Sequence, residues 1–275
     1  MRFVPLFKLV SFLFMVHKIL GDKPTKLFVV LASFFVANAL IAECIGGKLF
    51  SLERVFGLIP HPFTLLGEQG LTFTLTAGVL LWPLEFIMTD IVNEYFGPKA
   101  VRRISYIAVG LICYAFLMFY LAINVPADQG FWVGSQKDSG VPDMQVAFTS
   151  VFGQGMWIIV GSLMAFLLSQ LVDVYIFHKI KKVTGEKKVW LRATGSTVVS
   201  QLVDSFVVLF IAFKIGKDWS YQRVLSICLV NYAYKFTMAI VLTPVIYLIE
   251  QSIEKYLGKD TTHKMKQSAM GVVNE

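Results

Sequence analysis

Long apolar runs alternate with polar segments along this chain. Six runs are continuous enough to form membrane-spanning helices, at residues 27–45, 71–92, 104–125, 156–177, 193–213 and 224–249. Crossing about 30 Å of hydrocarbon takes about 20 helical residues, and backbone polar groups in lipid must pair with one another. The pattern therefore predicts an all-α fold, a polytopic membrane protein built as a six-helix transmembrane bundle.

The composition agrees with a lipid environment. Hydrophobic residues make up 56% of the 275 residues, charged residues only 16%, and the mean hydropathy is +0.67, which is too apolar for a soluble domain of this length. The net charge of +7 does not indicate nucleic acid, because the basic residues lie between the apolar runs. The three cysteines fall inside apolar runs, which favours packing over disulfides or metal binding.

The distribution of basic residues predicts the orientation. Of the 25 lysines and arginines, 18 precede the first run or follow the second, fourth and sixth runs, and six lie on the alternate side. Because basic residues gather on the cytoplasmic side, both termini are predicted to be cytoplasmic.

The predicted domains follow from the same pattern. Residues 1–26 form an amphipathic amino-terminal segment at the membrane surface, with an additional span as the alternative, since lysines interrupt its apolar patch. Residues 27–256 form the six-helix transmembrane domain, and residues 257–275 form a polar carboxyl-terminal tail.

A short internal repeat carries polar residues into two of the runs. Ser-Gln-Leu-Val-Asp occupies residues 169–173 and recurs at 200–204. Residues three or four apart share one face of a helix, so Gln170 with Asp173, and Gln201 with Asp204, form two polar clusters. If the two helices are antiparallel neighbours, the clusters meet in the bundle interior. A carboxylate at this depth marks a functional site by default, although Asp173 could be a solvated helix terminus.

The second run ends in further acidic residues. Asp90 and Glu94 are four residues apart and point the same way, after a helix kink expected at Pro83. Negative groups oppose the dipole at a helix carboxyl end, so they need partners. The candidates are Arg102 or Arg103 after the turn, or a ligand.

The last run contributes a stripe of Asn231, Tyr234, Lys235 and Met238. A lysine this deep is most easily held by an inward carboxylate such as Asp204. Asn38 in the first run either joins the same interior or packs helices together. With the aromatic residues Trp82, Tyr95, Tyr114 and Tyr234, these groups suit a flat, polar heterocycle, whose edge can hydrogen-bond and whose face can stack.

Other chemistries have no signal in the sequence. There is no glycine-rich phosphate loop, the four histidines lie outside the six runs, and no nucleophile motif occurs. We therefore expect no catalytic residues, no metal site and no cofactor, and the chain is not expected to be an enzyme.

Several motifs occur in a characteristic order: Trp82-Pro83-Leu84, the stretch 89–97, the two repeat copies, and Trp190-Leu191-Arg192. Over residues 27–256 the chain resembles the bacterial queuosine precursor transporter family. The resemblance implies a fold similar to the S components of energy-coupling-factor transporters. It also implies uptake of 7-deazapurines, such as 7-cyano-7-deazaguanine or 7-aminomethyl-7-deazaguanine, across the cell inner membrane for tRNA modification.

The resemblance suggests roles for the polar residues. Gln170, Gln201 and Asp204 would read the heterocycle edge, and Asn231 or Lys235 would contact its exocyclic oxygen. The substrate-binding residues are thus expected to be Asn38, Gln170, Asp173, Gln201, Asp204, Asn231, Tyr234 and Lys235. A cytoplasmic gate is expected to contain Asp90, Asn93 and Glu94.

The expected partners are the 7-deazapurine and membrane lipid, with no nucleic acid, and a homodimer is left open. Three rival interpretations stand beside transport by the chain alone. They are a vitamin-type binding subunit that needs a separate ATPase, a membrane enzyme acting on lipid-linked groups, and a structural or assembly protein.

Overall fold

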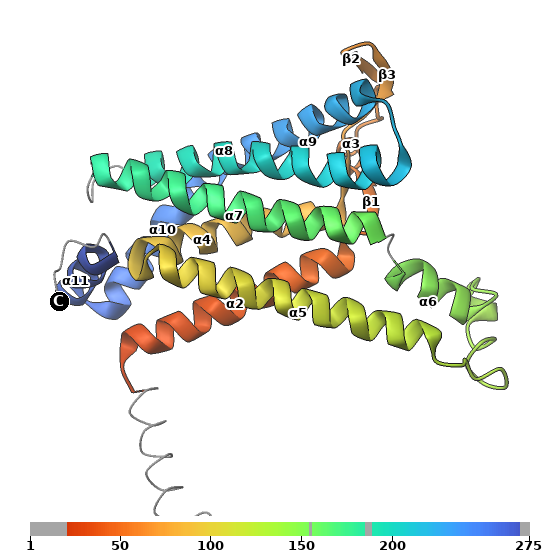
Figure 1. Cartoon of the computed structure of the whole chain (residues 1–275), viewed down its shortest axis with the longest axis horizontal. Coiled ribbons are helices and arrows are strands. Elements are labelled where there is room, and N and C mark those ends of the chain that lie inside the picture. Colours follow the sequence, from red (N-terminus) through yellow and green to blue (C-terminus); the bar gives the residue numbers. More distant parts are fainter. Residues whose placement is uncertain (1–20, 154–155, 185–188, 270–275) are drawn as a thin grey trace, which may run out of the picture.

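The computed structural model describes residues 21–153, 156–184 and 189–269 as a helical bundle (Figure 1). Five of the described helical segments are long and apolar enough to cross a membrane. They contain α2 (Lys23–Ile45), α5 (Pro98–Asn124), α7 (Met156–Thr184), α8 (Val189–Leu209) with the π-helix η3 (Phe210–Ile215), and α9 (Tyr221–Val241). The prediction of a mostly helical, polytopic membrane protein is confirmed. Most of the predicted amino-terminal segment 1–26 lies outside the described residues, and α2 begins at Lys23.

The second apolar run, 71–92, does not form one long helix as predicted. Its first residues form β4 (Thr74–Thr76), which pairs antiparallel with β1 (Leu49–Ser51), and the 3-10 helix η1 (Ala77–Leu80) follows. Alternating threonines favour a strand, and proline favours the first turn of a helix, so α4 (Trp82–Phe96) begins beside Pro83.

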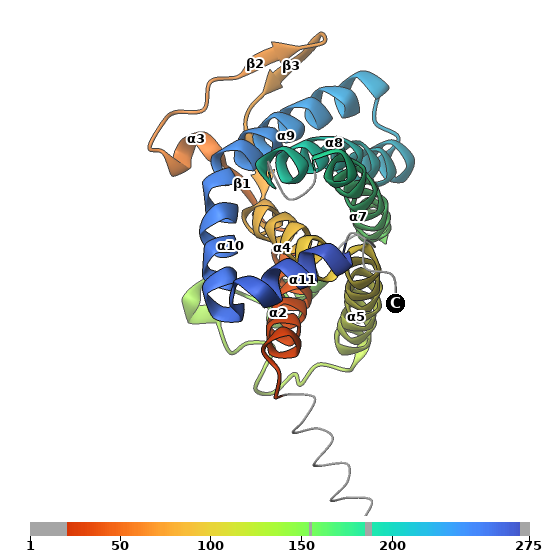
Figure 2. The same cartoon turned by 90° about the vertical axis from the view of Figure 1, so that its left-hand side faces the viewer.

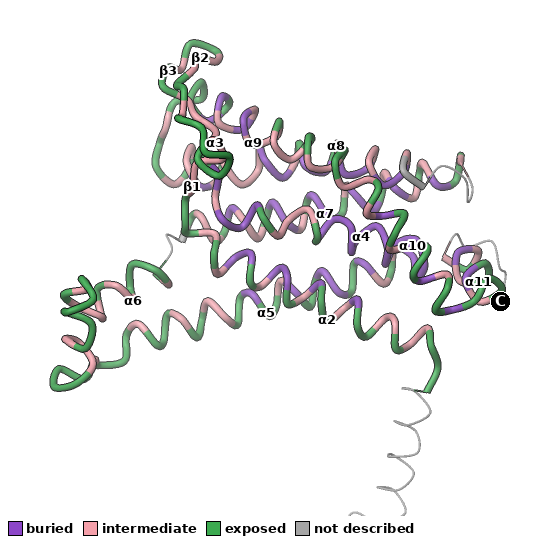
Figure 3. The backbone as a smooth tube through the Cα atoms, turned by 180° about the vertical axis from the view of Figure 1, so that it is seen from behind, coloured by how far each residue is buried: buried purple, intermediate pink, exposed green. Residues whose placement is uncertain are grey.

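Helix α4 lies at the centre of the bundle. Its 15 residues span only about 22 Å, yet those from Glu85 to Tyr95 are all buried (Figure 3). Figure 2, seen along the bundle, shows α4 enclosed by the longer helices. Polar residues on α4 therefore face protein rather than lipid.

The last apolar run, 224–249, is divided at Leu242. Helix α9 ends at Val241, and α10 (Thr243–Leu257) sets off in a new direction (Figure 2). Pro244 explains the division, because proline lacks an N–H group and clashes with the preceding helical turn. The break places α9 and α10 on two sides of α4.

The two ends of the bundle differ (Figure 1). At one end Gly97 and Gly258, both with positive φ, allow abrupt turns from α4 into α5 and from α10 into α11 (Lys259–Ala269). The opposite end holds short elements: β1, α3 (Leu52–Val55), β2 (Phe63–Leu65) paired with β3 (Glu68–Leu71), β4, η2 (Lys137–Ser139) and α6 (Met144–Phe152).

Close packing between α7 and the end of α8 depends on Gly161. A Cβ atom at this position would lie 2.9 Å from the carbonyl oxygen of Val208 and 3.3 Å from the backbone nitrogen of Ala212. Small residues allow such close approach between helices in lipid, where packing rather than the hydrophobic effect holds helices together.

We predict that Gly161→Ala destabilises the protein by about 1–3 kcal/mol, because the added methyl group forces α7 away from α8. The measurement is thermal unfolding in detergent. Gly110→Ala on α5 is the matched control, since nothing lies within 4 Å of its added Cβ. Equal midpoints for the two variants would contradict the packing argument.

Candidate functional site

A partly open cavity lies between α4, α8, α9 and α10. Its polar lining residues are Asp90, Thr194, Thr197, Gln201, Tyr234 and Lys235. Trp82 and Phe86, whose ring centroids are 6.4 Å apart, contribute aromatic surface on the α4 side. Of the predicted site residues, the structure thus brings together Asp90, Gln201, Tyr234 and Lys235.

The cavity contains buried polar atoms with no hydrogen-bond partner among the described residues. Among the described residues, neither Oε1 nor Nε2 of Gln201 has a partner, and neither has Oδ1 of Asp90. Gln201 is only 1% exposed and Asp90 only 3%. Buried polar groups in proteins almost always have partners, so such atoms require an explanation. A polar ligand or water in the cavity would supply both donors and acceptors.

The free space in the cavity is about 30 Å³. Ligand pockets are usually roughly 300–1,000 Å³. A two-ring heterocycle therefore requires side chains such as Trp82, Tyr234 or Met238 to move. Rotation of these side chains, or separation of α10 from α8, would provide the room.

Lys235 is held at the cavity wall by Asp204. The ammonium of Lys235 on α9 donates to Oδ2 of Asp204 on α8, and the two side chains are 10% and 7% exposed. The predicted ion pair is therefore present. Asp204 itself does not line the cavity, so its carboxylate acts on the cavity through the lysine.

The two repeat copies meet only in part. Helices α7 and α8 are neighbours, and Oγ of Ser200 donates to Oδ1 of Asp173 at 2.9 Å. Gln170 instead turns to α4, where its amide nitrogen donates to Oγ1 of Thr89 at 3.1 Å. The structure does not bring Gln170 and Asp173 to the cavity. Asp173 is fully buried, so a solvated helix terminus is the wrong interpretation.

The predicted asparagines also lie away from the cavity lining. Asn38 donates to Oε2 of Glu85 at 2.9 Å and to the carbonyl of Leu81, which joins α2 to α4. Asn231 donates to the carbonyl of Ile227 within α9. Asn93 is buried on α4, and its amide atoms have no hydrogen-bond partner among the described residues.

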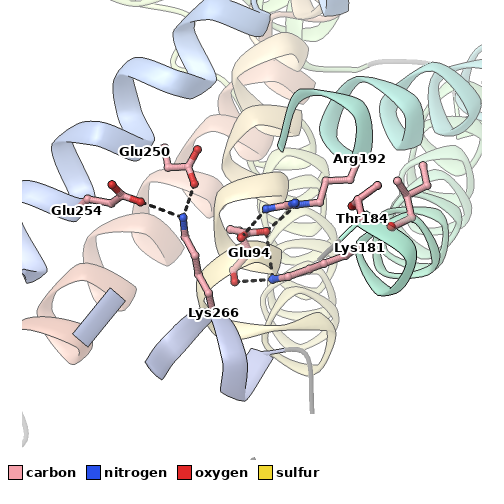
Figure 4. Close-up of polar contacts among 8 residues, drawn as sticks. Glu94, Lys181, Thr184, Arg192, Glu250, Glu254 and Lys266 are labelled. Atoms are coloured by element: carbon pink, nitrogen blue, oxygen red, sulfur yellow. Dashed lines mark hydrogen bonds and ion pairs between the residues drawn. The ribbon is translucent and has the colours of Figure 1, made fainter. Parts of the chain in front are cut away.

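Glu94 contacts two buried cations at the end of α4 (Figure 4). Its carboxylate receives two bonds from Arg192, at 2.7 and 2.9 Å, and lies 3.1 Å from Nζ of Lys181. Lys181 also donates to the backbone carbonyl of Glu94, and so caps the carboxyl end of α4. The expectation that Arg102 or Arg103 pairs with Glu94 is wrong, because both arginines are exposed on α5.

Helix α11 covers the same end of the bundle. Lys266 donates to Glu250 and, at 3.1 Å, to Glu254, both on α10 (Figure 4). Burial alone would lower the pKa of Lys266, but the hydrogen bond and charge of Glu250, the hydrogen bond to Glu254 and the charge of Glu94 raise it above its ordinary value. The lysine is therefore charged at physiological pH, and it ties α11 to α10.

Sequence reasoning missed several buried residues. Glu43 on α2 accepts a hydrogen bond from Ser162 on α7, and Glu85 accepts from Asn38. A carboxylate inside an apolar run was the available signal for Glu43. Lys181 was interpreted only as an indicator of topology, because it belongs to a basic segment. Arg192 was recognised as part of a family motif, but not as a partner of Glu94.

These features define a multi-pass helical membrane protein with a polar centre around α4. The model of a family described as putative vitamin uptake transporter matches residues 76–249. A probable queuosine precursor transporter of Bacillus subtilis (strain 168) is 30% identical over 189 residues, which cover 67% of this chain and 74% of that protein. The queuosine precursor transporter of Escherichia coli (strain K12) is 26% identical over 214 residues, or 77% and 87% of the two chains. No solved structure matches the chain.

The chain therefore belongs to the queuosine precursor transporter family, and it is a membrane transporter rather than an enzyme. The resemblance seen in the motifs is confirmed. The family match ends at residue 249, before α11 and most of the charged contacts that α11 makes with α10.

We predict that Glu94→Gln destabilises the protein by about 3–5 kcal/mol, because it removes the carboxylate that two buried cations contact. Asp218→Asn is the control, since Asp218 pairs with Lys214 at the exposed end of η3. Thermal unfolding in detergent should show a lower midpoint for Glu94→Gln alone. A midpoint equal to that of the control would mean that the buried contact contributes little.

Proposed function

We propose that the chain takes up 7-deazapurine precursors of queuosine across the cell inner membrane. The relatives named queuosine precursor transporters support this substrate class. The observation that carries the proposal is the cavity beside α4, where unpartnered Gln201 and Asp90 atoms lie next to the aromatic rings of Trp82 and Phe86.

The cavity lining complements a guanine-like ring. The carboxylate of Asp90 can accept from ring or exocyclic N–H groups, and the amide of Gln201 can both donate and accept. The ammonium of Lys235 can donate to an exocyclic oxygen. Trp82 offers a flat surface for the ring face. All four groups come from rigid helices, which limits the rotation of the bound ring.

The topology we propose has six crossings and both termini in the cytoplasm. Five crossings are the long helical segments named above, and β4, η1 and α4 together form the remaining one, which is second in chain order. Helix α4 is short and lies inside the bundle. The positive-inside pattern supports the orientation, since the basic residues after α4, in the last turn of α7, in the first turn of α8 and after α10 lie at one end (Figure 1). We propose a fold like that of vitamin-transporter S components, with residues 27–256 as the transport domain.

A cytoplasmic gate in this scheme consists of Glu94, Lys181 and Arg192. Glu94 lies one helical turn beyond Asp90, and Arg192 directly precedes the cavity residue Ala193. Opening the path to the cytoplasm would require α4 to separate from the ends of α7 and α8. Asn93, buried beside these groups, would gain partners in the open form.

The proposal is tested in cells that cannot make queuosine. Expression of the chain should restore queuosine in tRNA at low external concentrations of 7-cyano-7-deazaguanine. No restoration despite membrane expression would contradict the substrate class. Uptake by the purified chain in liposomes would also exclude a binding subunit that depends on an ATPase.

We predict that Gln201→Leu lowers uptake about 5- to 150-fold, because leucine fills the same space without hydrogen-bonding groups. Losing one or two such bonds costs about 1–3 kcal/mol. Gln251→Leu, at an exposed position of α10, is the matched control. Both variants should reach the membrane in equal amounts. Equal uptake would remove Gln201 from the substrate site.

A second prediction separates a structural role of the Lys235–Asp204 pair from a role in binding. Lys235→Met and Asp204→Asn should each lower the thermal midpoint, since each leaves one buried charge without its partner. The double variant should recover the midpoint but not the uptake, because the cavity then lacks its ammonium. Recovery of uptake in the double variant would make the pair purely structural.

A further inference from the structure

Among the residues that the structure describes, acidic side chains outnumber basic ones in the membrane-embedded interior. The buried acids are Glu43, Glu85, Asp90, Glu94, Asp173 and Asp204. The cations within reach of them are Lys181, Arg192 and Lys235. Two of these cations bind the same acid, Glu94, and Lys235 binds Asp204. The fixed cations of this interior therefore leave part of its negative charge unbalanced.

Asp90 and Asp173 have no ion-pair partner within 4 Å in the part of the chain that the structure describes. Asp173 is fully buried and accepts from Ser200, whereas Oδ1 of Asp90 accepts nothing. An uncompensated carboxylate inside the membrane costs several kcal/mol, and the group then takes up a proton or a cation instead.

Asp90 and Asp173 also lie where α4 and α7 are in contact. Gln170, one helical turn before Asp173 on α7, donates to Thr89, which directly precedes Asp90 on α4. Asp173, Glu94 and Arg192 lie within electrostatic range of Asp90, and Lys235 shares its cavity. On the other helices around α4, Arg102 is exposed, Glu250 and Lys266 pair with each other, and Glu43 accepts from Ser162. Two neighbouring carboxylates in a medium of low dielectric repel each other, and a proton bound by either one relieves this repulsion.

Because Asp90 lines the cavity, the protonation of this pair is linked to ligand binding. A neutral heterocycle entering beside two anions would displace the water that screens them, at a high cost in free energy. Entry of the ligand together with a proton avoids this cost. A proton needs only one carboxylate oxygen, whereas a metal cation needs several ligands, and no group of three or more metal-binding side chains occurs among the described residues.

We propose that this chain is a proton symporter, in which the Asp90–Asp173 pair carries a proton inward with the heterocycle. The inference rests on the proposed function. On the outer side a carboxylate oxygen of the pair binds a proton from water. The proton returns to water on the cytoplasmic side when α4 separates from α7 and α8, and no other bond is formed or broken.

The test uses the purified full-length chain in liposomes with clamped membrane potential and labelled 7-cyano-7-deazaguanine, which is uncharged. With one-to-one coupling, an inward proton gradient of about one pH unit should accumulate the base about tenfold. A pH-sensitive dye inside the vesicles should report acidification when the base is added. Counterflow, the exchange of labelled for unlabelled base at equal pH, measures transport without any gradient.

Asp173→Asn should abolish accumulation but retain counterflow, because asparagine imitates the protonated acid and does not line the cavity. Asp138→Asn, on an exposed turn, is the control for accumulation. Counterflow by the unaltered chain without accumulation or acidification would overturn the symport proposal and leave the proposed function standing. Accumulation driven by a sodium gradient would have the same two consequences. Absence of counterflow by the folded chain would overturn the proposed function and symport together.

Discussion

The structure depends on compensation of charge in a medium that cannot solvate it. Helix α4 carries Glu85, Asp90 and Glu94 through the centre of the bundle, where all three are buried and an isolated carboxylate is costly. The surrounding helices supply the compensation: α2 through Asn38, α7 through Lys181 and α8 through Arg192. The position of α4 is therefore fixed by polar contacts in addition to the packing that holds helices together in lipid.

The need for charge compensation also connects the proposed gate at Glu94 with the proposed binding site at Asp90. At the end of α4 the carboxylate of Glu94 contacts two cations, and in the proposed scheme these contacts close the path to the cytoplasm. One turn away, at Asp90, the pairing is incomplete and a cavity begins. A site with unsatisfied groups can bind a ligand that satisfies them, whereas a satisfied cluster resists opening. In the proposed scheme, transport requires the ligand to satisfy the groups at Asp90 and the cluster at Glu94 to open, and both lie on α4.

The sequence was sufficient for features that depend on one helix at a time. Apolar length located five membrane-crossing helices, and the stripe of Tyr234 and Lys235 placed both at the cavity. Contacts between helices were harder. Lys181 and Arg192 belong to a basic segment whose charge is explained by topology, so nothing in their spacing indicates Glu94 as a partner. Gln170 and Asp173 belong to the first copy of the repeat, and Gln201 belongs to the second. Gln170 nevertheless faces α4 and Asp173 faces α8, because packing sets the rotation of α7 about its axis. Pro244 indicated that the last apolar run would divide near Leu242. The prediction of one continuous helix followed the apolar length of the run instead.

The central claim is that a planar heterocycle binds between α4, α8, α9 and α10. The most direct measurement is an experimental structure of the full chain in a lipid environment with 7-cyano-7-deazaguanine. We predict density for the base on the face of Trp82, with Gln201 and Asp90 within hydrogen-bonding distance of its edge. Density for the base at another place in the bundle, with Gln201 and Asp90 still without partners, would contradict the account.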